Sequence, residues 1–79
     1  MIRSYLDEAV KRARYTQLED GCYCAEVRGL RGVIATGDTL EACRTTLQEV
    51  VEEWLLVRVS RGLDVPVLGR VRIRVRKAS

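Results

Sequence analysis

Residues 18–42 read LEDGCYCAEVRGLRGVIATGDTLEA, and this stretch decides the fold that the chain is expected to adopt. The pair Asp20-Gly21 lies between two segments in which polar and apolar residues alternate, which is typical of a β-hairpin. Two glycines, Gly29 and Gly32, then predict a loop before a short third strand. The expected strands span residues 14–19, 22–28 and 33–36. Because they follow one another through short connections, they should pair as a three-stranded antiparallel meander.

The stretch ends on the start of a long helix. Asp38 or Thr39 can cap the free N–H groups of a helix that runs to about Ser60, and Asp38 with Glu41 fits a capping box. One broad face of this helix is apolar and should pack on the sheet; it contains Leu40, Cys43, Leu47, Val50, Val51, Trp54 and Leu55, with Arg58 at its end. Trp54 is interpreted as a core residue, and an interface anchor is the alternative.

The flanking segments complete the fold. Residues 2–13 carry apolar residues at three- and four-residue spacing, which predicts an amphipathic N-terminal helix. Residues 63–69 form a connector that contains Pro66, and the alternation of apolar residues and arginine over residues 70–76 then predicts a last strand. The expected fold is therefore α+β in the order α-β-β-β-α-β, as a single domain over residues 1–79.

The composition of the chain bears on where the protein is located and on whether it binds a metal or a cofactor. The chain has 79 residues, of which 47% are hydrophobic and 32% charged, a balance typical of one globular domain. No apolar run reaches the roughly 20 residues that span a bilayer, and the N-terminus lacks a secretion signal, so we expect a cytoplasmic protein without membrane contact. Cys22, Cys24 and Cys43 are an odd set without metal-site spacing, and histidine is absent. We therefore expect structural cysteines, no metal and no cofactor.

Catalysis is not expected. The commonest general base is missing, and no phosphate-binding, metalloprotease or serine-hydrolase motif occurs. Glu52 and Glu53 are neighbours on a helix and point in different directions, so a solvated acidic face explains them better than a shared metal. The chain is predicted not to be an enzyme and to have no catalytic residue.

A row of arginines at the C-terminus has two interpretations. Arg70, Arg72, Arg74 and Arg76 share one face of the expected last strand. The preferred interpretation is the charged outer face of an edge strand, which discourages pairing with other sheets. The alternative is a small nucleic-acid-binding protein that uses this basic strand for phosphate contacts.

The hairpin, loop and helix start resemble the HicB-like antitoxin family. Residues 20–27 fit the family pattern D-G-x-Y-x-A-x-V, and residues 29–42 contain its L-x-G loop and resemble its G-D-T-x-E-E-A helix start. The helix around Trp54 is similar to the family's second half, so the resemblance covers residues 14–62. It implies a truncated RNase H-like fold without nuclease carboxylates. It also implies a protein that binds a HicA-type toxin, a small basic RNA-cleaving protein, and masks the active site of that toxin.

Three features depart from the family pattern. Many members continue into a helix-turn-helix or ribbon-helix-helix segment, and because this sequence ends soon after its expected last strand, operator binding by this chain is not expected. Members are commonly acidic, whereas this chain carries a net charge of +3. Residues 1–13 are a helical addition to the common core, which is followed by the connector and last strand over residues 63–79.

If the resemblance holds, three regions are candidates for the protein-binding surface. They are the exposed side of the sheet, the loop at residues 29–32 and the acidic part of the long helix. The residues chosen from them are Glu26, Leu30, Arg31, Glu49 and Glu53. The sheet face that carries Cys22, Cys24 and Glu26 should not be covered by the long helix, so we also expect a homodimer.

Overall fold

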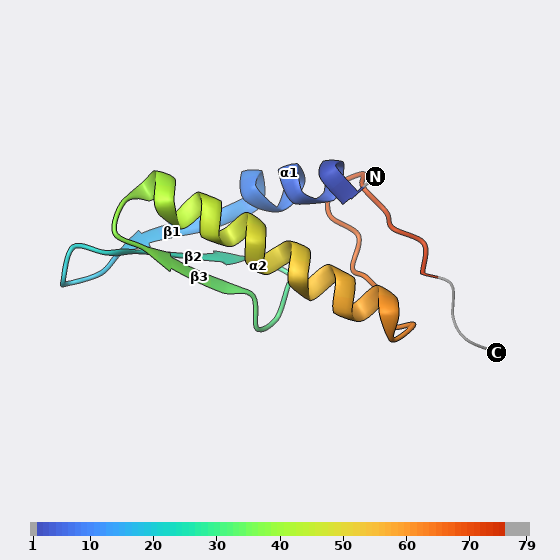
Figure 1. Ribbon diagram of the computed structural model, residues 1–79. Coiled ribbons are helices and arrows are strands. Elements are labelled where there is room, and N and C mark those ends of the chain that lie inside the picture. Colours follow the sequence, from blue (N-terminus) through green and yellow to red (C-terminus); the bar gives the residue numbers. More distant parts are fainter. Residues whose placement is uncertain (1, 76–79) are drawn as a thin grey trace.

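The computed structural model describes residues 2–75 as two helices and a three-stranded antiparallel sheet (Figure 1). The elements are α1 (Ile2–Arg12), β1 (Ala13–Gln17), β2 (Tyr23–Val27), β3 (Ile34–Gly37) and α2 (Leu40–Ser60). The strands lie in the order β1-β2-β3. The predicted α+β class and the order helix, three strands, long helix are confirmed, with element ends shifted by one or two residues.

The hairpin between β1 and β2 is closed by a loop of three residues, not by Asp20-Gly21 alone. Leu18 N–H donates to the Cys22 carbonyl over 2.7 Å, and Gly21 N–H donates to the Leu18 carbonyl over 2.9 Å. Gly21 has a φ of 92°, the left-handed region that favours glycine. The Asp20 carboxylate accepts the Cys22 N–H at 2.9 Å. The loop is thus a tight turn followed by a glycine bulge, a common hairpin connection.

The two faces of the sheet differ in burial. Ala25 and Val27 of β2 point to the core together with Ala35 of β3. On the opposite face Arg14, Glu26 and Ile34 form one cross-strand row, and Thr16, Cys24 and Thr36 form the next. Ile34 is 56% exposed, so this outer face is open to solvent. It has the alternation of an antiparallel sheet that is covered on one side only.

Helix α2 begins at a threonine cap. Thr39 has extended backbone angles, and its hydroxyl accepts the Ala42 N–H at 3.0 Å. The predicted helix start is confirmed, but the capping box of Asp38 and Glu41 is wrong because Thr39 occupies the cap position. Gly37 lies against the first turn, where an added Cβ would meet the Cys43 nitrogen at 2.5 Å. The absent side chain therefore lets the helix approach β3 closely.

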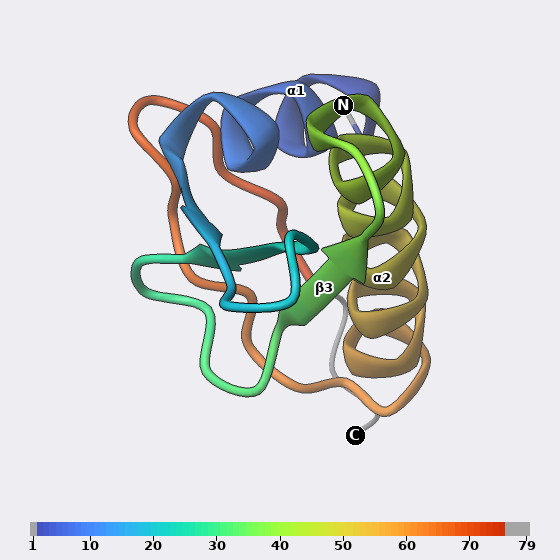
Figure 2. The same cartoon turned by 90° about the vertical axis from the view of Figure 1, so that its left-hand side faces the viewer.

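The core lies between the sheet and the two helices. Cys43, Leu47, Val51 and Leu55 form the fully buried ridge of α2, and α1 adds Tyr5, Leu6 and Ala9. In the view of Figure 2, α1 and α2 enclose one side of the sheet, and the segment after α2 returns toward α1. Trp54 is half-buried at the edge of the core, with the Arg58 guanidinium 5.2 Å from its ring centre. The interpretation of Trp54 as a core residue is thus correct only in part.

The predicted last strand is not found within the described residues. Leu68 and Val71 exchange two backbone hydrogen bonds of 2.8 and 3.1 Å around Gly69 and form one isolated bridge. The next hydrogen-bonded pair of such a hairpin would join Pro66 to Ile73. Pro66 has no N–H, and its carbonyl accepts the Tyr5 hydroxyl at 2.7 Å. The ladder therefore stops after one pair, although Val71, Ile73 and Val75 still pack against the core.

Candidate functional site

A groove between α1 and α2 carries a cluster of acidic side chains. Its volume is about 510 Å³. Three carboxylates, Glu49, Glu52 and Glu53, lie along its α2 side. The other lining residues are Arg3, Leu6, Thr45, Gln48 and Leu56. We call this feature the acidic groove.

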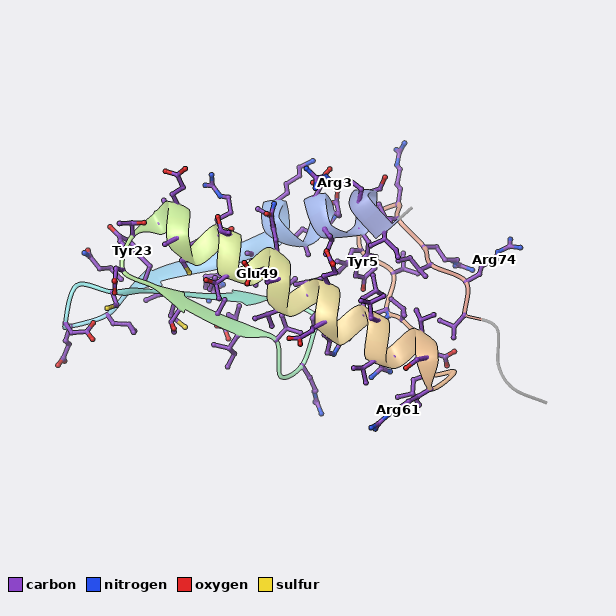
Figure 3. The ribbon with its side chains drawn as sticks, viewed as in Figure 1. Arg3, Tyr5, Tyr23, Glu49, Arg61 and Arg74 are labelled. Atoms are coloured by element: carbon purple, nitrogen blue, oxygen red, sulfur yellow. The ribbon has the colours of Figure 1, made fainter. Side chains whose placement is uncertain are left out.

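The acidic groove combines exposed charge with an apolar floor. Arg3 is the one cation among its lining residues, and it forms a solvent-exposed ion pair with Asp7 at 3.8 Å. The three glutamates form no salt bridge within residues 2–75, which leaves their charge available. Leu6 is buried in the floor, whereas Leu56 is 50% exposed. Such a surface fits a partner segment that offers lysine or arginine around an apolar side chain. Figure 3 shows Arg3 and Glu49 on their two helices.

The residues predicted to bind a protein do not form one surface. Glu49 and Glu53 share the acidic groove, but Glu26 lies on the outer face of the sheet. Arg31 is exposed in the loop between β2 and β3, beside Trp54 and Pro66. Leu30 is only 3% exposed and packs in the core, so its side chain is not at the surface.

Sequence patterns missed the apolar part of the acidic groove. Leu6 belongs to the packed stripe expected of the first helix, and no pattern singles out Leu56. The available signal was the run Trp54-Leu55-Leu56-Val57, because a helix that is apolar on several sides needs more than one packing surface. The position of α1 beside α2 was the missing information.

The arginines of the C-terminal segment are exposed on one side of an extended chain. Arg70, Arg72 and Arg74 alternate with half-buried apolar residues, and Figure 3 shows Arg74 reaching away from the body. Arg76 lies outside the described residues. The arrangement presents three guanidinium groups in a row, a geometry suited to an anionic chain.

The cysteines show no metal-site geometry. Cys43 is buried, and burial raises the pKa of its thiol. Partial burial and the carboxylates of Asp20 and Asp38 raise the pKa of Cys22, whose sulfur lies 3.6 Å from an Asp38 oxygen. Among residues 2–75, no group of three or more potential ligands could hold a metal ion. A thiol with a raised pKa is also a poor nucleophile at neutral pH.

Neither described helix is both long enough and apolar enough to cross a membrane.

Comparison with known proteins identifies the family. The UPF0150-like family matches residues 4–66. A crystal structure of TTHA0281 from Thermus thermophilus has a TM-score of 0.82 and 46% sequence identity, covering 90% of this chain and 95% of that chain. No curated protein matches the chain. Because the family match extends over most of the sequence, including the three strands and α2, the chain belongs to the UPF0150-like family.

Proposed function

We propose that this chain is a non-catalytic protein-binding module, a HicB-like antitoxin or a stand-alone relative of one. Its partner would be a small basic RNA-cleaving toxin of the HicA type, whose active site it masks. The UPF0150-like match and the hairpin-loop-helix pattern of residues 18–42 support the family assignment. The observation that carries the proposed binding is the acidic groove.

The acidic groove supports binding of a basic partner although the net charge of the chain is positive. A net charge of +3 would repel a basic toxin at long range. Charges separated by more than about 8–10 Å are screened at physiological salt, so the local sign of a surface decides its contacts. Glu49, Glu52 and Glu53 make one side of α2 acidic. A basic segment of the toxin would bind there, with Leu56 as the apolar contact.

The test is the affinity of the product of the adjacent gene for the wild-type chain and for Glu49→Lys. Reversing one groove charge is expected to weaken binding at least tenfold, because the groove carboxylates face a basic partner. Glu19→Lys is the matched control, since Glu19 is exposed in the hairpin loop and the same charge change occurs outside the groove. Equal weakening by both variants would refute the groove as the binding site. Absence of any association would refute the proposal for that partner.

Nucleic-acid binding through the C-terminal segment is the second candidate function. It is favoured by the exposure of Arg70, Arg72 and Arg74 on one side of that segment. Phosphate contacts release counterions, so binding of a single-stranded RNA should weaken steeply with salt. Replacing the three arginines with glutamine should abolish it. No RNA binding at low salt would exclude this function.

A further inference from the structure

The C-terminal half of α2 carries apolar side chains on more than one side. Leu55 completes the buried ridge, but Val57 is 47% exposed on a different side of the same helix. Leu63, which follows the helix, is 43% exposed and lies next to Val57. Val50 and Trp54 are half-buried beside them and line the same shallow hollow. We call Val50, Trp54, Val57 and Leu63 the α2 patch.

The α2 patch is held in place by contacts that keep its residues at the surface. Leu63 N–H donates to the Arg58 carbonyl at 2.8 Å, which turns the chain back along the helix. The Arg58 guanidinium donates to the Asp64 carbonyl at 2.6 Å and lies over Trp54. The patch is thus a fixed surface, because both its helix and the following turn are hydrogen-bonded.

Two residues of opposite charge flank Val57, the centre of the patch, at equal separations in the sequence. Glu53 is four residues before Val57, and Arg61 is four residues after it. Arg61 is the C-cap residue that directly follows Ser60, the last residue of α2. The helical repeat of 3.6 residues per turn, continued to this cap, places all three positions within about 40° of a common direction. Neither Glu53 nor Arg61 forms a salt bridge within residues 2–75. Figure 3 shows the Arg61 side chain pointing away from the end of α2.

We propose that the α2 patch binds a second copy of this chain, with the two α2 helices antiparallel across a two-fold axis near Val57. In that arrangement each Val57 packs on its counterpart, and Glu53 of each copy meets Arg61 of the other. A two-fold interface requires a surface that is complementary to itself, and this spacing supplies both the apolar centre and the paired charges. Hot spots are enriched in tryptophan and arginine, and Trp54 is one of the residues that line the hollow of the patch.

The outer face of the sheet is the competing surface for self-association. Ile34 is the one large apolar residue there that is mostly exposed, among the residues that the structure describes, and its neighbours in the cross-strand row are Arg14 and Glu26. A face of this composition is typical of a sheet that water covers. The α2 patch groups four apolar residues around one hollow and has a two-fold charge pattern, so it is favoured over the sheet face. This inference does not depend on the identity of any toxin.

The experiment is sedimentation equilibrium of the purified chain at 1–100 micromolar (a range of roughly two decades around the affinities of weak dimers). The expected mass rises with concentration from 9.0 kDa to twice that value. Val57→Glu should raise the dimer dissociation constant at least tenfold, because two carboxylates would meet at the centre. Ile34→Glu is the matched control, since it places the same charge at an exposed apolar position on the sheet face. Circular dichroism checks that both variants keep the native fold.

Charge reversal separates this arrangement from other interfaces. Glu53→Arg alone and Arg61→Glu alone should each weaken the dimer, because like charges would then face each other across the axis. The double variant should regain dimerisation, a rescue that general loss of structure would not produce. A chain that stays at 9.0 kDa throughout, or a dimer that Ile34→Glu disrupts and Val57→Glu does not, would overturn the proposal.

Discussion

Replacing Tyr5 with phenylalanine removes one hydroxyl from the core and leaves the aromatic ring in place. The Tyr5 side chain, labelled in Figure 3, is fully buried. Its hydroxyl donates to the Pro66 carbonyl at 2.7 Å. This bond joins α1 to the segment after α2, over 61 positions of sequence. Loss of one such bond costs about 0.5–1.5 kcal/mol. Tyr5→Phe should therefore lower the free energy of unfolding at pH 8 by about 1 kcal/mol.

At alkaline pH the Tyr5 hydroxyl lowers the stability of the wild-type chain, whereas at pH 8 it raises that stability. Burial raises the pKa of Tyr5 from 10.0 to about 12, and the positive charge of Arg58 offsets this only in part. The neutral phenol is thus favoured in the native state. The contribution of the neutral phenol to the stability of the native state is complete below pH 10 and is lost as the pH rises from 10 through 12. At pH 11 a shift of this size removes about 1.4 kcal/mol from the wild-type chain, and Tyr5→Phe cannot lose it.

The assay is urea unfolding of both chains at pH 8 and at pH 11, under reducing conditions, followed by circular dichroism. Tyr5→Phe should be the less stable chain at pH 8 and about equal or slightly more stable at pH 11. Tyr23→Phe is the matched control, because the Tyr23 hydroxyl forms no hydrogen bond within the described residues. It should change stability by less than about 0.5 kcal/mol at either pH. A stability difference between wild type and Tyr5→Phe that is the same at both pH values would refute the reasoning.

Three further predictions concern the core, the helix cap and the thiols. Leu47→Ala should lower the free energy of unfolding by about 2–5 kcal/mol, measured by urea titration, because Leu47 is fully buried between α2 and the sheet. Thr39→Ala should cost about 0.5–2 kcal/mol in the same titration because the helix loses its capping hydroxyl, and an unchanged midpoint would contradict the cap. Cys43 should react with a thiol reagent only on unfolding, whereas Cys24 should react in the native chain and Cys22 should react there slowly because its pKa is raised. Equal rates for all three thiols would contradict the burial of Cys43.

Local patterns predicted the sheet because each strand carries its own signal. Asp20-Gly21 marked the first turn, and the alternation around Ala25 fixed which side of β2 is buried. The start of α2 was recognisable from the residues that can cap it. The choice between Asp38 and Thr39 depended on backbone angles, which sequence does not specify.

The last strand could not be judged from alternation alone. Val71, Ile73 and Val75 do pack inward as the pattern predicts. A strand also needs a neighbour with free N–H and carbonyl groups. Pro66 has no N–H, and its carbonyl is bonded to the Tyr5 hydroxyl. This contact joins residues far apart in the chain, so no local pattern reveals it.

The candidate site was also predictable only where its features are local in the sequence. The acidic part of α2 was visible in the sequence, and it contains Glu49 and Glu53. The groove itself depends on where α1 packs, which set Leu6 and Leu56 beside those carboxylates. Leu30 belongs to a loop motif, yet it is a core residue, because loop residues in a small domain often supply apolar side chains to the interior.

The most direct test of the proposed function is RNA cleavage by the purified product of the adjacent gene, measured as the chain is added in increasing amounts. Masking of the toxin active site predicts that cleavage falls in proportion to added chain and stops near stoichiometric amounts, and that Glu49→Lys requires a large excess. Cleavage that continues unchanged at a large excess of the wild-type chain would contradict the antitoxin function.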